Sequence, residues 1–246
     1  MDLSLSREQK AIRHLLNEQS PLDGIASYFA FYHPAARSRI VVYPENSRLA
    51  TGYVAISRTG IDLFRPFLTL RLPPEDIDGG VDLIYSALPP GTAAIINALP
   101  ADVPLLAALF DIQTEETVRL LVLDESRFEP IINVLVVETP SNNAYPRFVI
   151  RSTTTGSDEI AASAGINWQT DHFAEVSVNT NPRHRRQGFG RSVVAAAMNY
   201  VLGNGRTPLY AVTENNQASL QLAQSVGFVD KGFRHEILQG NLKPRL

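Results

Sequence analysis

RRQGFGR, the stretch Arg185–Arg191, lies between a strand-like run that ends at Thr180 and an apolar helix that begins near Phe189. Gly188 and Gly190 allow a tight turn and let a ligand come close to the backbone, because glycine has no Cβ. The first N–H groups of the following helix lack intrahelical partners and lie at the positive end of the helix dipole. The stretch therefore predicts a cradle for a phosphate or diphosphate.

The stretch differs from two other glycine-rich turns that bind nucleotides. Arg185, Arg186 and Arg191 add cationic donors around the turn, which favours an anion site over an ordinary tight turn before a helix. A dinucleotide-binding turn needs a third glycine, but position 193 is Val. A P-loop needs Gly-Lys-Ser/Thr, which the stretch lacks. Neither nucleotide-binding class is therefore favoured.

Composition narrows the class of protein. The 246 residues are 44% hydrophobic, enough for one large domain or two small ones. The chain has no cysteine, which excludes disulfides and thiolate nucleophiles, and its five histidines lack metal-ligand spacing, so we expect no metal. The net charge is −3, and no run approaches the roughly 18 apolar residues of a membrane helix. We expect a cytoplasmic protein that binds neither membrane nor nucleic acid.

The order of predicted elements indicates a duplication. In the first half we expect two helices from a capping box at Ser6 and Gln9 onward, then strands at 39–43, 51–57 and 62–71, a helix at 75–87, a strand at 92–97, a helix at 103–110 and a strand at 117–123. After a linker at 124–130 we expect strands at 131–137, 147–153, 159–168 and 173–180, a helix at 189–202, a strand at 208–213, a helix at 217–226 and a short strand from Phe228.

Both halves contain three strands, helix, strand, helix, strand. This predicts a mixed α/β fold with two domains, 1–125 and 131–246. The two halves differ where the third strand crosses to its helix. In the first half this crossing reads RLPPEDIDGG, Arg71–Gly80, whose prolines lack N–H donors and whose acids repel phosphate. We therefore expect one anion site per chain, in the second domain.

The run Glu175–Phe228 resembles the cofactor-binding core of the GNAT superfamily of acyl-CoA-dependent N-acyltransferases. Arg185-x-x-Gly188-x-Gly190 is similar to the diphosphate loop of that superfamily. The resemblance continues in the strand end Val178-Asn179-Thr180, in Asn216 with Ser219 and Leu222, and in the ending Gly227-Phe228. The first half resembles a degenerate repeat, as in the glycine acyltransferase-like branch.

This resemblance implies a GNAT-like fold in each half, acetyl-CoA as co-substrate, and a reaction that needs no covalent enzyme intermediate. The diphosphate would be held by the backbone amides of the cradle and its cations, and the pantetheine arm by the strand end. The implied contacts are Arg185, Arg186, Gln187, Gly188, Phe189, Gly190, Arg191, Val178, Asn179, Thr180, Asn216 and Ser219. The acetyl group would pass directly to an amine of a small molecule or peptide.

Direct transfer needs a general base for the amine and a proton donor for the departing thiolate. Glu175 is the candidate base, although it could equally be a solvated or salt-bridged strand residue. Many members of the superfamily carry a tyrosine seven residues after the motif asparagine, but here that position is Ala223. The proton donor for the thiolate would be water, Ser219 or a tyrosine elsewhere in the chain. Asn216 also fits as the N-cap of the following helix.

Two other functions remain open at the level of sequence. A CoA-binding regulatory protein without turnover would keep the glycines but need no base. An RNA-binding module would use the arginines of the cradle, although the acidic net charge and the lack of interleaved aromatic residues count against it. The oligomeric state, monomer or homodimer, and the identity of the acceptor are not determined by these patterns.

Overall fold

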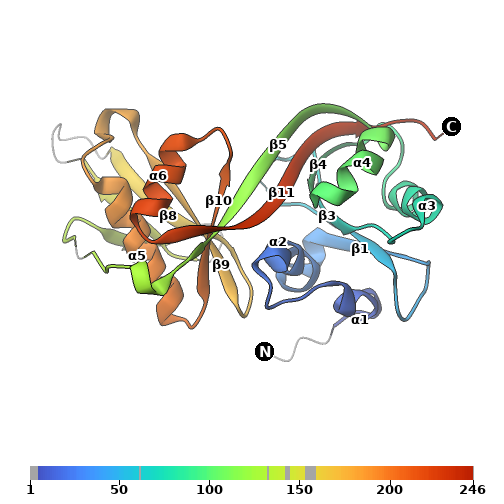
Figure 1. Cartoon of the computed structure of the whole chain (residues 1–246), viewed down its shortest axis with the longest axis horizontal. Helices are drawn as coiled ribbons and strands as arrows, with labels where there is room; N and C mark the ends of the chain where they lie inside the picture. Colours follow the sequence, from blue (N-terminus) through green and yellow to red (C-terminus); the bar gives the residue numbers. More distant parts are fainter. Residues whose placement is uncertain (1–4, 61, 132, 142–144, 153–158, 246) are drawn as a thin grey trace. The chain divides into compact units, whose positions relative to one another are not determined.

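The computed structural model describes residues 5–60, 62–131, 133–141, 145–152 and 159–245. The chain forms two compact units: unit 1 comprises Met1–Val118 and Arg234–Leu246, and unit 2 comprises Arg119–Phe233. Strand β5 (Phe110–Leu123) carries the chain out of unit 1 and strand β11 (Phe228–Leu242) returns it (Figure 1). The predicted mixed α/β fold, strands and helices around a mixed sheet, is confirmed.

Unit 1 begins with helix α1 (Arg7–Ile12), whose predicted capping box between Ser6 and Gln9 is present. Its regular elements continue with α2 (Gly24–Ser27), β1 (Ser38–Tyr43), β2 (Gly52–Ser57), β3 (Phe67–Arg71), α3 (Ile77–Ala87), β4 (Ala93–Ala98) and α4 (Val103–Leu109). The first three strands pair antiparallel, and α3 crosses over to place β4 parallel to β3. The third strand starts later than the predicted residue 62, because the Asp62 carboxylate accepts the N–H groups of Phe64 and Arg65 and forms a turn before Pro66.

Unit 2 repeats this succession of elements. Its strands are β6 (Val137–Thr139), β7 (Arg147–Arg151), β8 (Ile160–Gln169), β9 (Phe173–Thr180) and β10 (Thr207–Thr213), and its helices are α5 (Phe189–Gly203) and α6 (Gln217–Ser225). Strands β6 to β9 pair antiparallel in sequence order, and β10 is parallel to β9. As in unit 1, a helix therefore connects the last strand of the antiparallel series to a strand that runs parallel to it.

Two predicted elements of unit 2 differ from the structure. The predicted strand at 131–137 is wrong for its described residues before Val137, where β6 begins: the Asn133 side chain accepts the N–H of Leu135, and Val136 donates to the Asn133 carbonyl, so the segment turns. The predicted linker 124–130 contains a short 3-10 helix, Glu125–Arg127, and Asp124 donates its N–H to the Gly227 carbonyl. Local side-chain bonds and packing therefore override the sequence pattern here.

The last strand is also longer than predicted, and it changes units. The strand order is β1-β2-β3-β4-β11 in unit 1 and β5-β10-β9-β8-β7-β6 in unit 2. Residues 236–241 of β11 pair antiparallel with β4, which is why Arg234–Leu246 belongs to unit 1 and not to the predicted range 131–246. Each unit thus completes its sheet with a strand contributed by the other half of the sequence.

The core of unit 2 holds the cradle in place. Helix α5 packs across β7, β8 and β9 (Figure 1), and its inner face is made of valines, small alanines and Met198. Alanine at Ala195 and Ala197, both fully buried, lets the helix axis approach the sheet closely. The start of α5 is therefore fixed at the end of β9.

Within the described residues, no helix is long and apolar enough to cross a membrane.

Candidate functional site

The turn before α5 has the backbone geometry of an anion cradle. Gly188 is the N-cap of α5 with φ +78°, and Arg186 also has a positive φ of 59°. Because the N-cap residue is glycine, no side chain at that position caps the first turn of the helix. A Cβ built on Gly188 would meet no atom within 4 Å, so the space beside the turn is open. The N–H groups at the start of α5 can therefore receive an anion.

Gly190 is required for a different reason. It is buried, and a Cβ at this position would lie 2.8 Å from Thr180 Oγ1 and 3.3 Å from Leu222 Cδ2. Any larger residue would push the start of α5 away from the end of β9. Gly188 thus provides the turn conformation, while Gly190 provides the close approach of helix and strand.

The cations of the cradle face solvent. Arg185, Arg186 and Arg191 are exposed, as is Gln187, whereas Phe189 is partly buried against the core. In the part of the chain that the structure describes, none of these three arginines forms an ion pair with an acid. Their guanidinium groups remain available to a phosphate, to which arginine can donate two parallel hydrogen bonds.

Strands β9 and β10 separate beside the cradle. Their parallel pairing runs from Phe173 and Thr207 to Glu175 and Leu209 and stops there, although β9 continues to Thr180 and β10 to Thr213. On its other edge, the second half of β9 pairs with β8 through Val178, Asn179 and Thr180. The edge of these three residues that faces β10 therefore lacks a strand partner, and its backbone groups can bind an extended ligand.

Glu175 sits at the last paired position before this separation. Its two carboxylate oxygens accept hydrogen bonds from Asn167 Nδ2 and Trp168 Nε1, both at 2.6 Å. β8 contains a bulge between Ile166, which pairs with Val176, and Trp168, which pairs with Glu175. Asn167 is the extra residue of this bulge, so both Asn167 and Trp168 can reach the Glu175 carboxylate.

Burial sets the protonation behaviour of Glu175. Desolvation raises the pKa of the carboxyl above its ordinary value, and the hydrogen bonds from Asn167 and Trp168 offset part of that rise. A carboxylate with a raised pKa is a stronger base than an exposed one, and the two donors stabilise its charged form. Glu175 therefore has both the position and the electrostatic environment of a general base.

Helix α6 brings a pair of hydroxyl groups to the same region. Tyr210 is buried on β10, and its hydroxyl lies 2.7 Å from Ser219 Oγ in the first turn of α6. Burial raises the pKa of Tyr210, and the nearby charge of Glu175 raises it further, so the phenol stays protonated. Asn216 caps α6 by accepting the N–H of Ser219. Ala223, one turn later, is fully buried and has no proton to donate.

The equivalent helix start in unit 1 is closed by its own side chain. The Asp76 carboxylate caps α3 by accepting the N–H of Gly79 at 2.8 Å. Pro73 and Pro74 precede it, so this turn has fewer free donors than the turn before α5. A negative charge already occupies the position that a phosphate would take.

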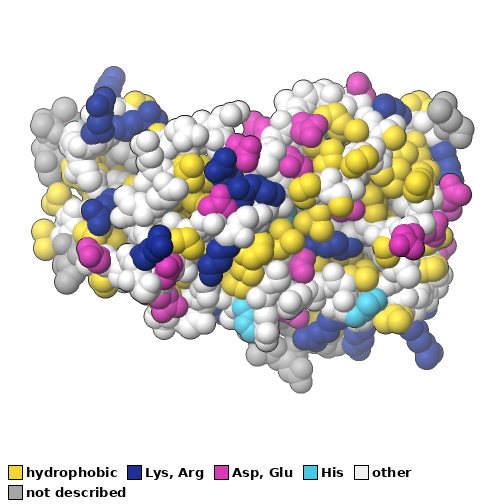
Figure 2. Space-filling view, in the orientation of Figure 1, with side chains coloured by type: hydrophobic (Ala, Val, Ile, Leu, Met, Phe, Trp, Pro, Cys, Tyr) yellow, Lys and Arg dark blue, Asp and Glu magenta, His cyan; other side chains and the backbone are white. Residues whose placement is uncertain are grey.

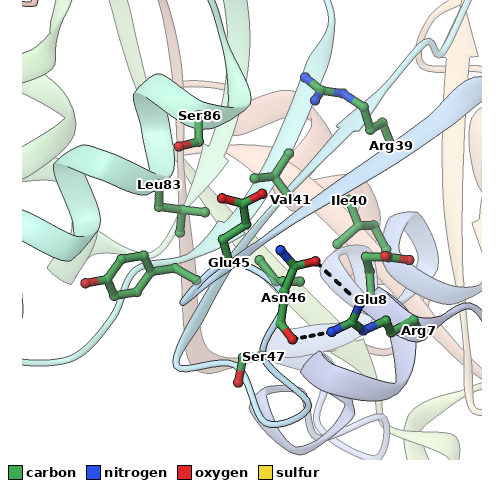
Figure 3. A pocket seen from close by; sticks show the side chains of 12 residues that line it. Arg7, Glu8, Arg39, Ile40, Val41, Glu45, Asn46, Ser47, Leu83 and Ser86 are labelled. Atoms are coloured by element: carbon green, nitrogen blue, oxygen red, sulfur yellow. Dashed lines mark hydrogen bonds between the residues drawn. The ribbon is translucent and has the colours of Figure 1, made fainter.

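Each unit also contains a surface cavity. One cavity of unit 2, about 270 Å³, is lined by residues of β7, β8 and β9 that include Asn167 and Ser177, and Asn167 donates a hydrogen bond to Glu175. In unit 1, a cavity of about 490 Å³ is lined by residues of α3, α4 and the segment 243–245, and another, of about 460 Å³, lies around β1 (Figure 3). Two of its arginines are bound by the protein itself, Arg7 by Asn46 and Arg39 by the Ala87 carbonyl. The cavity of unit 2 is the one connected to the candidate base.

The face shown in Figure 2 carries charges of both signs. On the side shown in Figure 2, lysine and arginine side chains are interspersed with acids. Among the residues that the structure describes, no group of three or more histidine or acidic side chains is arranged to hold a metal ion.

Sequence reasoning missed several members of this site. Trp168 ends the predicted strand at 159–168; it is buried, and its indole N–H binds Glu175. Tyr210 was read only as part of a strand. A parallel strand next to β9 places alternate residues on the helix-covered face, and this parity was the signal that could have identified Tyr210. The contribution of Asn167 depends on the bulge, which the sequence does not indicate.

Comparisons with known proteins agree with this geometry. Residues 109–228 match the family model described as "Acetyltransferase (GNAT) family". A comparison with the curated proteins found no match.

Solved structures extend the similarity over both units. A Drosophila protein aligns with a TM-score of 0.63 and 15% identity, covering 95% of this chain and 87% of that one. A "Tandem GNAT protein from the clavulanic acid biosynthesis pathway" aligns with a TM-score of 0.60 and 12% identity, covering 97% and 94%. An N-acetyltransferase from Kribbella flavida has a TM-score of 0.57 and 16% identity, covering 86% and 92%. At these identities the likeness concerns the fold.

Proposed function

We propose, because residues 109–228 match the family model of the GNAT acetyltransferases, that the protein is an N-acyltransferase that moves an acetyl group from acetyl-CoA to an amine. One observation carries the proposal: the uncapped start of α5 lies at the end of β9, and β9 parts from β10 at Glu175. An extended ligand with a diphosphate at one end can thus reach a base at the other.

The residues present fit coenzyme A. The open turn at Gly188 and the amides of Phe189 and Gly190 would hold the diphosphate, together with the exposed arginines. The unpaired edge of Val178–Thr180 would bind the amides of the pantetheine arm. When bound, the thioester supplies an activated acyl group.

Three residues divide the proton transfers. Glu175 accepts the proton of the attacking amine, directly or through one water, while Asn167 and Trp168 hold its carboxylate in place. Ser219 and Tyr210 form a hydrogen-bonded pair of hydroxyl groups, and Ser219 is the partly exposed member of the pair. We assign to this pair the proton that the departing thiolate needs, in place of the tyrosine that Ala223 replaces.

The remaining features form part of the same proposal. Unit 1 is a degenerate GNAT-like domain of a tandem protein, as in the glycine acyltransferase-like branch; it has the same succession of elements as unit 2, but Asp76 closes its cradle. The acceptor is an amine of a small molecule or peptide, and the protein acts in the cytoplasm as a monomer or homodimer.

A thiol-release assay tests the proposal. Acetyl-CoA is incubated with a panel of amines, and free CoA is measured with a thiol reagent for the wild type and for Glu175→Gln. We expect release that depends on both the amine and Glu175. Tight CoA binding by calorimetry without release for any amine would instead favour the alternative, a CoA-binding regulatory protein. Binding of RNA that weakens steeply with salt, without binding of CoA, would favour the second alternative, an RNA-binding module.

A further inference from the structure

The cavity of unit 2 exists because one strand residue has no side chain. Gly165 lies inside β8, and a Cβ built on it would meet no atom within 4 Å. Its φ is not in the positive range, so the backbone conformation does not require glycine here. Glycine inside a strand weakens the strand, and it is often found where a ligand approaches the backbone closely.

The side chains on either side of Gly165 are polar. In the antiparallel pairing, Arg147 of β7 and Ser177 of β9 lie directly opposite Gly165. Directly opposed residues point to the same face of a sheet. With strands spaced by about 5 Å, Arg147 and Ser177 therefore border a gap about 10 Å wide at the level of their Cα atoms. The cavity of about 270 Å³ occupies this gap.

Arg147 is held so that it borders the cavity. Its Nη2 donates a 2.8 Å hydrogen bond to Ser163 Oγ, and Ser163 is buried, 5% exposed. One bond leaves most of the five N–H donors of the guanidinium group available. Within the described residues, Arg147 forms no ion pair that would neutralise it. Arg147 is exposed, and this one bond directs its positive charge to one end of the cavity.

The other end of the cavity connects to the base. Ser177 Oγ donates to Asn167 Oδ1 at 2.9 Å, and Asn167 Nδ2 donates to Glu175 at 2.6 Å. Ser177 and Glu175 are two residues apart on β9 and share a face. A molecule in the cavity thus lies between a cation, Arg147, and Asn167, whose amide binds the carboxylate that would take the proton of an amine.

We propose that the acyl acceptor is a small amine that also carries an anionic group, a carboxylate, and that Arg147 binds this group over Gly165 while the amine faces Glu175. The inference rests on the proposed function, because it names the acceptor class of the same site. A guanidinium and a carboxylate form paired, charge-assisted hydrogen bonds, which give orientation as well as affinity.

Matched amines test the inference. Thiol release from acetyl-CoA is measured with phenylalanine against phenethylamine and with 4-aminobutyrate against butylamine, since each pair differs only in the carboxylate. We expect the wild type to favour the acids by roughly 10- to 100-fold in kcat/KM, the worth of one charged hydrogen-bonded pair. Arg147→Gln should remove this preference and leave the neutral amines unchanged, while Arg147→Lys should restore part of it.

Two further variants separate shape from charge. Gly165→Val should fill the cavity and lower activity toward acids and neutral amines alike. Arg127→Gln is the matched control, because this arginine of unit 2 is 68% exposed and pairs with Asp124 outside the cavity. All variants should bind CoA with wild-type affinity by calorimetry. Equal use of acids and neutral amines by the wild type, or equal loss of both in Arg147→Gln, would overturn the inference.

A binding measurement distinguishes this inference from the proposed function. If no amine releases thiol, saturation-transfer NMR of phenylalanine and 4-aminobutyrate is recorded with CoA present. Binding of the acids that Arg147→Gln abolishes would support the anion site and place the failure in the catalytic proposal. Absence of binding, or binding that does not depend on Arg147, would refute the anion site.

Discussion

Replacement of Gly188 by glutamate puts a negative charge where the diphosphate is expected. With φ at +78° and no atom within 4 Å of a built Cβ, a side chain at this position has room but a strained backbone. That strain costs about 1–2 kcal/mol in stability, for alanine as for glutamate. The carboxylate adds repulsion: two like charges about 4 Å apart interact by roughly 4 kcal/mol at an effective dielectric constant of 20. That energy corresponds to about a thousandfold in affinity.

The comparison of Gly188→Glu with Gly188→Ala isolates this charge, because both variants carry the same strain. Solvent and salt screen part of the repulsion, so we expect the glutamate variant to bind CoA at least about 100-fold more weakly than the alanine variant. Affinity is measured by calorimetry, and thermal unfolding checks that the two variants have similar Tm values. Equal affinities of the two variants would show that the diphosphate does not bind at the start of α5.

Three further predictions concern the base, the proton donor and unit 1. In Glu175→Gln we expect kcat to fall by about 100-fold or more at unchanged CoA affinity. Since burial raises the pKa of Glu175, wild-type kcat/KM should fall as pH decreases through that raised pKa, and the variant should lose this limb; an unaltered pH profile would assign the base elsewhere. Tyr210→Phe should lower kcat by roughly 10-fold without weakening CoA binding, because Ser219 loses its partner; unchanged turnover would exclude the pair as proton donor. Calorimetry should give one CoA per chain, since Asp76 caps α3, and a ratio of two would contradict that reading.

The sequence determined the features that depend on neighbours along the chain. The turn of the cradle follows from Gly188, and the capping box follows from Ser6 and Gln9; both are local hydrogen-bond and dihedral preferences. Strand and helix order followed from apolar periodicity in the same way. The same locality explains the failures: Asp62 and Asn133 bond nearby N–H groups and turn the backbone where the apolar pattern predicted strands.

Only the tertiary structure decided which strands complete each sheet. Nothing in the sequence of β11 states that residues 236–241 pair with β4, because any strand of suitable pattern can join an open sheet edge. The same holds for the site: the donors on Glu175, the contact of Tyr210 with Ser219 and the row of Arg147 and Ser177 across Gly165 all depend on register between strands. Register is fixed by packing over the whole sheet, so residues distant in sequence meet only in the folded chain.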